Sequence, residues 1–325
     1  MRLPFSFNTS VHLSGRLVAL LLFSTACATR TVVVTEPISV PGIRIVDAAS
    51  KQDVGFDALV KQLTETDVVF FGEYHDDPET HRVEFGLLDA VSRTGRPVIL
   101  SLEMFERDAQ PLLNEYLAGR ISESDFLAKS RPWDRYITDY RPMVELAKAK
   151  GWPVIASNIP RPMASAVGRK ALAALDTLTP LERTWAARDI KCPEDAYRAR
   201  FMETMRGHGS GGAAPQPADT LPTAVANRFY LAQCIKDETM AESIVEARNG
   251  RPPDAIVVHY DGAFHSDYRQ GTVDRVKRRA PSLRLTVITA VPGLDPSTAT
   301  LADHAGRADY IIFTKRIPPK PPAKP

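Results

Sequence analysis

The chain has 325 residues, of which 44% are hydrophobic and 25% are charged, a composition typical of a globular protein. Its 41 Lys and Arg residues nearly balance its 39 Asp and Glu residues, so the net charge of +2 gives no argument for a nucleic-acid or other polyanionic partner. The length suits one large α/β domain with additional segments, and also two domains.

The first 27 residues are typical of a signal peptide. Arginines precede a short apolar run at residues 17–23, far below the ~20 residues that span a bilayer. Small residues then precede Cys27, which resembles a bacterial lipobox with Ser24 where leucine is usual. We predict an exported lipoprotein, lipidated at Cys27 and anchored in the cell envelope, in the outer membrane facing the periplasm or the cell surface. The alternative is an ordinary signal peptide cleaved near Ala26.

The next segment, residues 28–52, has no clear period and is interpreted as a tether. Beyond it, short apolar runs predict strands at 68–71, 98–102, 153–157, 255–259, 283–289 and 309–313. Helical patterns cover 56–63, 79–92, 109–117, 123–129, 141–150, most of 162–206 and about 223–248. This alternation predicts an α/β domain over residues 53–315, with a mostly parallel sheet, helices on both faces and a helical insertion.

Two segments have a different composition. Residues 207–221 are rich in Gly, Pro and Ala and are predicted to form a flexible insertion, while residues 316–325 form a basic, proline-rich tail. Cys192 and Cys234 flank the insertion. An exported location permits a disulfide between them, and separate burial of each cysteine is equally consistent with the sequence.

Three predicted strands are followed at once by acids and imidazoles, listed in chain order: Glu73 and His75, then Glu103, then His259 and His265. In an α/β protein, ligands collect at the carboxyl ends of parallel strands, because the loops there carry chemistry while the sheet holds them rigid. We therefore expect these side chains to form one site.

Two of the histidines share one motif, a glycine three residues before the imidazole, in Gly72–His75 and Gly262–His265. Glycine permits a sharp turn, so each histidine would fold back over the sheet. His75, Glu103 and His265 together suit a divalent metal ion. Their orientation would depend on neighbouring Asp76, Asp77 and His81. The alternative is that each histidine only caps a turn or a helix.

Two further features point to an acidic or flat ligand. Asn158 and Arg161 follow the third strand and suit a carboxylate or phosphate, unless they form only a proline-stopped turn with a solvated arginine. Residues 131–143 combine aromatic side chains with arginines, which suits a flat apolar ligand with acidic arms. Tyrosine phenolate is a known ligand of haem iron. The alternative for these aromatics is a helix–helix contact.

Motifs along residues 55–292 resemble the ChaN-like haem-binding uptake lipoproteins of the Tiki superfamily. They are Gly72-Glu73-Tyr74-His75-Asp76, Leu102–Glu106 with Gln110, Tyr140-x-Pro142, Asn158-x-Pro160-Arg161, Gln233-x-x-x-Asp237-x-x-Met240-Ala241 and Gly262-x-x-His265. The resemblance implies a parallel-sheet α/β fold, haem as the bound group and a role in bacterial iron uptake. It also implies haem transport components of the outer membrane or periplasm as partners, and it leaves room for a homodimer.

The resemblance further implies a tyrosine ligand for the iron, which we assign to Tyr140, with Tyr136 in reserve. The remaining predicted haem-site residues are Asn158, Arg161, His75 and His265.

A second hypothesis comes from the wider superfamily, which includes metal-dependent proteases. Their metal-site residues map onto His75, Glu103 and His265, and Glu73 would then act as general base on metal-bound water. The sequence has no G-x-S-x-G, P-loop or G-x-G-x-x-G motif, which removes the main support for three common enzyme classes. Our first hypothesis is therefore a membrane-anchored haem-binding protein without turnover, and the alternative is a metal-dependent hydrolase.

Overall fold

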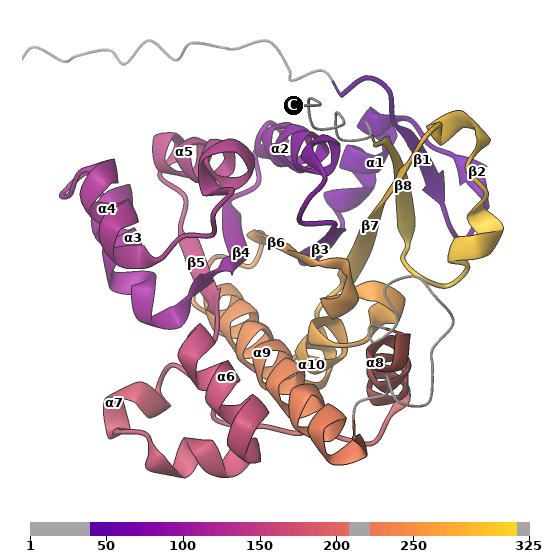
Figure 1. Ribbon diagram of the computed structural model, residues 1–325. Helices are drawn as coiled ribbons and strands as arrows, with labels where there is room; N and C mark the ends of the chain where they lie inside the picture. The colour runs from indigo at the N-terminus through magenta and orange to yellow at the C-terminus, as the bar shows by residue number, and fades with distance from the viewer. Residues whose placement is uncertain (1–39, 208–221, 317–325) are drawn as a thin grey trace, which may run out of the picture. The chain divides into compact units, whose positions relative to one another are not determined.

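A computed structural model describes residues 40–207 and 222–316 (Figure 1). Eight strands in these ranges form one sheet in the order β2-β1-β8-β7-β3-β6-β4-β5. The six strands from β3 to β8 pair in parallel, while β1 pairs antiparallel with β2 and β8. The predicted fold class, a mostly parallel sheet with helices on both faces, is confirmed.

The strands are β1 (Arg44–Asp47), β2 (Gln52–Asp53), β3 (Val68–Glu73), β4 (Val98–Glu106), β5 (Val154–Asn158), β6 (Ile256–Gly262), β7 (Leu285–Gly293) and β8 (Tyr310–Lys315). The α-helices are α1 (Phe56–Leu63), α2 (Pro78–Ser92), α3 (Gln110–Leu117), α4 (Glu123–Ser130), α5 (Arg141–Lys150), α6 (Arg161–Lys170), α7 (Pro180–Arg183), α8 (Ala196–Gly207), α9 (Thr223–Asn249) and α10 (Thr272–Arg279). No helix in the described ranges is long and apolar enough to cross a membrane.

The two faces of the sheet are covered by different helices (Figure 1). On β3, Val69 and Phe71 belong to the core beneath α1, α2 and α5, whereas Val68 and Phe70 belong to the core beneath α9 and α10. All four side chains are fully buried. Because successive side chains of a strand point to opposite faces, burial on both faces requires the continuous apolar run seen in the sequence.

The predicted helical insertion forms a small core of its own against α9. Ile159, Val167 and Ala186 pack there with Ile235 of α9. A disulfide joins Cys192 to Cys234, which resolves the two alternatives that the sequence left open. The insertion is therefore attached to α9 both by apolar packing and by a covalent bond.

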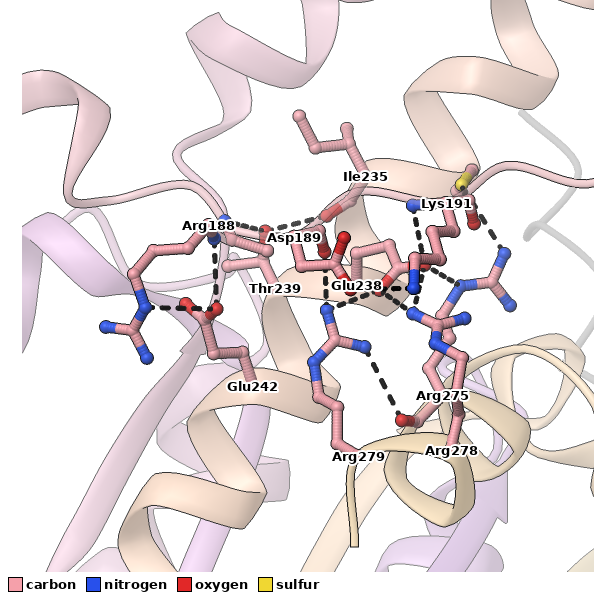
Figure 2. Close-up of polar contacts among 12 residues, drawn as sticks. Arg188, Asp189, Lys191, Ile235, Glu238, Thr239, Glu242, Arg275, Arg278 and Arg279 are labelled. Carbon is pink, nitrogen blue, oxygen red and sulfur yellow. Dashed lines mark hydrogen bonds and ion pairs between the residues drawn. The ribbon is translucent and has the colours of Figure 1, made fainter.

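A network of buried charges joins α9 to α10. Figure 2 shows Glu238 surrounded by Arg275, Arg278 and Arg279. Glu238 is fully buried, and its Oε1 also accepts a hydrogen bond from the backbone N–H of Lys191 at 3.1 Å. The carboxylate has a donor for each oxygen, so the network holds the two helices and the insertion together.

The interpretation of residues 28–52 as a tether is wrong from residue 44 onward. β1 pairs with β8 over Arg44–Asp47, and Ile45 and Val46 are 4% and 1% exposed. The residues that looked patternless include β1, which lies between β2 and β8 in the sheet. The sequence did not reveal it, because a strand of four residues is too short to show a clear period. Several predictions fall on residues that the structure does not describe. They are the signal peptide with Cys27, residues 28–39 of the tether, residues 208–221 of the flexible insertion and residues 317–325 of the tail.

Candidate functional site

The candidate site lies at the carboxyl ends of β3, β6 and β4, which are neighbours in the sheet. Glu73, the last residue of β3, pairs in register with Gly262, the last residue of β6. The short 3-10 helix η5 (Ala263–His265) follows directly and carries His265. The two glycine–histidine motifs lie side by side, as predicted. They do so because β3 and β6 are parallel and stay paired up to their carboxyl ends.

The two motif glycines serve close packing rather than the sharp turn that we expected. Gly262 has an ordinary φ of −58°. A Cβ on Gly262 would lie 2.7 Å from His75 Nε2, and a Cβ on Gly72 would lie 2.9 Å from Ala263 Cα. Each motif thus leaves space for the other, and any larger residue would force the two loops apart.

Glu73 organises the residues on the cavity side. Its Oε1 accepts hydrogen bonds from the Tyr140 hydroxyl at 2.6 Å and from His75 Nδ1 at 2.5 Å. Burial opposes the charge on Glu73, but the hydrogen bond from His75 and the nearby imidazole of His81 outweigh it and lower the pKa of Glu73 to about 2. Glu73 is therefore an ionised acceptor that fixes an imidazole and a phenol at once.

His75 and Tyr140 differ in access to solvent. The side chain of His75 is 44% exposed, whereas Tyr140 is 1% exposed as a residue. Burial and the nearby Glu73 raise the pKa of Tyr140 far above its usual value, so its phenol keeps the proton. Glu73 holds Nδ1 of His75, which leaves Nε2 as the ring nitrogen available to a ligand.

A second buried set consists of Glu103, His265 and Asp237. Glu103 Oε2 accepts the backbone N–H of Gly262 at 2.7 Å, and Glu103 Oε1 lies 3.3 Å from His265 Nε2. His265 Nδ1 lies 2.6 Å from Asp237 Oδ1. Burial opposes a charged imidazole, but the two carboxylates outweigh it and raise the pKa of His265 to about 10. The same contact with His265 lowers the pKa of Glu103 despite burial.

The structure brings the predicted metal ligands His75, Glu103 and His265 to one edge but gives their donor atoms other partners. Among the described residues, the one group of three such side chains with donor atoms within 4.8 Å of one another is Glu73, His81 and Glu84. The predicted trio is not such a group: Glu103 and His265 lie 3.3 Å apart, but His75 is held by Glu73 instead.

Two cavities meet at His75. One, of about 640 Å³, is lined by Glu73, Tyr74, His75, Asp76, Gly262, Ala263, Phe264, His265, Asp267 and Arg307. The other, of about 250 Å³, is lined by His75, Pro132, Trp133, Asp134, Arg135, Tyr140 and Arg161. Sites for cofactors and small ligands occupy roughly 300–1,000 Å³, so the larger cavity is of that size and the smaller one extends it at His75.

The smaller cavity contains the aromatic and arginine residues predicted to hold a flat ligand. The rings of Trp133 and His75 meet edge to face with centroids 4.8 Å apart. Arg161 is 67% exposed in its side chain, and its Nε lies 3.9 Å from the carboxylate of Glu106. Its guanidinium is therefore free to meet an acidic group of a ligand at the rim.

Two of the predicted haem-site residues, Tyr136 and Asn158, have other roles. Tyr136 is 2% exposed and packs against Phe105 and Phe126, so it does not line either cavity. Asn158 donates its side-chain amide to the backbone oxygen of Glu103 at 3.1 Å, across an irregular stretch of the β4–β5 pairing. It therefore positions Glu103 rather than contacting the cavity.

His259 does not reach the cavities either. It is fully buried inside β6, and its Nδ1 lies 2.9 Å from Ser101 Oγ. Burial lowers the pKa of His259 to about 3, so the ring stays neutral. Asp77, expected to orient a ligand, instead caps α2 by accepting the backbone N–H of Thr80.

The sequence reasoning missed several acidic residues around the site. Glu84 lies one turn after His81 on α2, a spacing that places both on one helix face and that a search for H-x-x-E would have found. Asp237 lay within a motif of the family resemblance but received no role. Asp139 lies in the segment before α5 and contacts His81, and no local sequence pattern predicts that contact.

A protein-family model described as haem-binding uptake, Tiki superfamily, ChaN matches residues 59–276. The chain belongs to this family. A search of curated proteins finds no significant match.

Solved structures with similar folds include ChaN of Campylobacter jejuni, in a structure of cofacial haem binding, with 15% identity and a TM-score of 0.63. The match covers 84% of this chain and 97% of that one. An erythromycin esterase mutant, EreC in its open conformation, has 10% identity and a TM-score of 0.46, with the same 84% and 97% coverage. The RRSP toxin effector domain of Vibrio vulnificus has 16% identity and a TM-score of 0.40, over 75% of this chain and 37% of that one. At these identities the likeness to ChaN concerns the fold.

Proposed function

We propose that this member of the ChaN family binds haem beside His75, in the space between Trp133, Tyr140 and Arg161. The observation that carries the proposal is the placement of these four residues around one cavity by segments far apart in the sequence. A flat apolar ring with two carboxylates needs aromatic walls and a cation at the rim. Trp133 and Tyr140 provide the walls, and the exposed Arg161 provides the cation.

Two side chains are candidate ligands for the haem iron. His75 is exposed, and Glu73 holds its Nδ1, an arrangement that commonly orients imidazoles for metal binding. Tyr140, the ligand expected from the family resemblance, would first have to give up its hydrogen bond to Glu73 and its proton. The geometry therefore favours His75 as the first contact of the iron.

A titration of the purified chain with hemin, followed by its Soret absorption band, tests this function. We expect a saturable shift of the band at micromolar hemin. His75→Ala and Tyr140→Phe should each weaken binding by about tenfold or more, the equivalent of ~1.4 kcal/mol. Tyr136→Phe is the matched control, because Tyr136 lies in the core with an unpaired hydroxyl. No shift in the wild-type chain would reject the proposal.

The cellular role extends this proposal. We propose an exported lipoprotein, anchored through Cys27, that takes part in bacterial iron uptake with haem transport components of the envelope. We also propose a homodimer, for which the family resemblance leaves room. Labelling of the mature chain with a fatty-acid analogue, lost in Cys27→Ser, tests the anchor, and light scattering with and without hemin tests the dimer.

The metal-dependent hydrolase hypothesis has weaker support. It is favoured by the buried carboxylates below the cavity, since haem binding alone has little need for them. A general base works best with a pKa near the working pH, and the pKa of Glu73 is about 2. Glu73 is thus a strong hydrogen-bond acceptor but a poor base, and we place haem binding first.

A further inference from the structure

Another group of ionisable residues lies beneath the proposed haem cavity, between β3 and α2. We define the Glu73 cluster as Glu73, His81 and Glu84. Glu73 is 2% exposed, His81 4% and Glu84 0%. Buried charges require partners or a metal ion, so the contacts of each donor atom decide what this cluster does.

The spacing of the donor atoms suits a small metal ion. His81 Nδ1 lies 3.0 Å from Glu84 Oε2 and 3.4 Å from Glu73 Oε2. Nitrogen and oxygen ligands of Zn²⁺ lie at ~2.0–2.2 Å in a tetrahedral arrangement, which separates neighbouring ligand atoms by about 3.3–3.6 Å. One ion among the three atoms therefore requires only small shifts of side chains.

The other nitrogen of His81 is oriented as metal-binding histidines usually are. His81 Nε2 lies 3.2 Å from the backbone oxygen of His75 and 3.3 Å from Asp139 Oδ2. Both are acceptors for the Nε2 proton. Nδ1 is therefore the nitrogen that can face an ion between Glu73 and Glu84, once it gives up the proton that it shares with their carboxylates. Asp139 is itself paired with Arg135, so its charge is already balanced.

The cluster also has unused carboxylate oxygens. Glu73 uses Oε1 for His75 and Tyr140. Among the described residues, the buried Glu73 Oε2 and Glu84 Oε1 have no hydrogen-bond partner, and Glu73 Oε2 has only His81 Nδ1 near it, at 3.4 Å. Two carboxylates and a neutral imidazole carry a charge of −2, which one divalent cation would neutralise. Without the ion, protons must occupy the cluster, and metal binding would release them.

We propose that Glu73, His81 and Glu84 bind a divalent transition-metal ion. Imidazole and carboxylate donors without sulfur suit Zn²⁺, Mn²⁺ and Fe²⁺. The site differs from the predicted His75, Glu103 and His265 set and does not depend on haem binding. Its ion ties α2 to β3 and holds Glu73, whose other oxygen positions His75 and Tyr140.

Binding of Zn²⁺ to the haem-free, chelator-treated chain tests the site, measured by calorimetry and by the melting temperature. We expect one Zn²⁺ per chain and a higher melting temperature when Zn²⁺ is present. Glu84→Gln should abolish stoichiometric binding, and Glu79→Gln, a change at a more exposed position of the same helix, should leave it intact. Asp139→Asn, which changes a neighbour of His81 Nε2 but none of the three proposed ligands, should weaken binding by about 10- to 100-fold.

Two results would overturn the proposal. One is a wild-type chain that binds no Zn²⁺, which would mean that the buried carboxylates share protons instead. The other is binding that survives Glu84→Gln but disappears in His265→Gln, which would place the ion at the other end of the site. Hemin titration of the same haem-free protein is read separately, so failure of either proposal leaves the other measurable.

Discussion

Two buried carboxylate groups in this molecule are surrounded in opposite ways. Glu238 on α9 faces three arginines of α10 and a backbone N–H, so each of its oxygens has a donor (Figure 2). Glu73 and Glu84 face each other across a single imidazole, and one oxygen of each has no hydrogen-bond donor within the part of the chain that the structure describes. A buried carboxylate with surplus donors holds the fold together, whereas carboxylates with a deficit of donors indicate a ligand that the chain itself does not supply.

The largest expected effect is a loss of stability when Glu238, rather than a residue of the Glu73 cluster, is replaced. Glu238→Gln removes the carboxylate that pairs with Arg275, Arg278 and Arg279. Breaking a buried ion pair on one side usually costs about 3–5 kcal/mol, because it leaves uncompensated charge. We expect a loss of that size in the free energy of unfolding, measured in urea, with hemin and Zn²⁺ affinity unchanged in the folded protein.

Glu246→Gln is the control for this prediction. Glu246 lies on the same helix and pairs with Arg188, but its side chain is 48% exposed. A surface pair of this kind contributes about 0–1 kcal/mol, so the control should be close to the wild type. Equal effects of the two substitutions would show that burial of the Glu238 network does not matter.

An effect of intermediate size on the free energy of unfolding is expected when the pH is raised, because His265 then loses its proton. The pKa of His265 is about 10 in the folded chain and 6.5 for an unperturbed histidine. A raised folded pKa stabilises the fold fully below pH 6.5, and this contribution is lost as the pH rises towards 10. We expect a loss on the order of 1 kcal/mol or more over this window, measured by urea unfolding. In His265→Gln the loss should be smaller, and an identical pH profile would contradict the assignment.

The smallest expected effect comes from Glu84. Burial and the neighbouring Glu73 raise the pKa of Glu84 well above its usual value, so the metal-free chain holds it protonated. Glutamine resembles the protonated acid. Glu84→Gln should therefore change the free energy of unfolding of the metal-free chain by less than about 1 kcal/mol. A loss as large as that of Glu238→Gln would remove the distinction between the two groups.

The parts of the site that the sequence predicted lie at or near the carboxyl ends of strands. Glu73, Glu103 and His265 each come after an apolar run, and parallel pairing brings such positions to one edge. The fold class could be predicted for the same reason, since alternating strand and helix signals leave few topologies.

The remaining features depend on contacts that no local pattern records. Tyr136 and Tyr140 are four residues apart, and only the irregular turn at Tyr136–Tyr140 directs one to the core and the other to the cavity. His259 lies within a strand buried on both faces, so alternation gives no sign of its direction. Glu84 looked like an ordinary helix acid, because its role depends on β3, a segment outside its own helix.

The central claim is that the cavity beside His75 binds haem. The most direct test is a hemin titration of the purified wild-type chain and of a double variant with His75→Ala and Tyr140→Phe, followed at the Soret band. The account predicts saturable binding by the wild-type chain and loss of that binding in the double variant. A double variant that binds hemin as tightly as the wild type would contradict it.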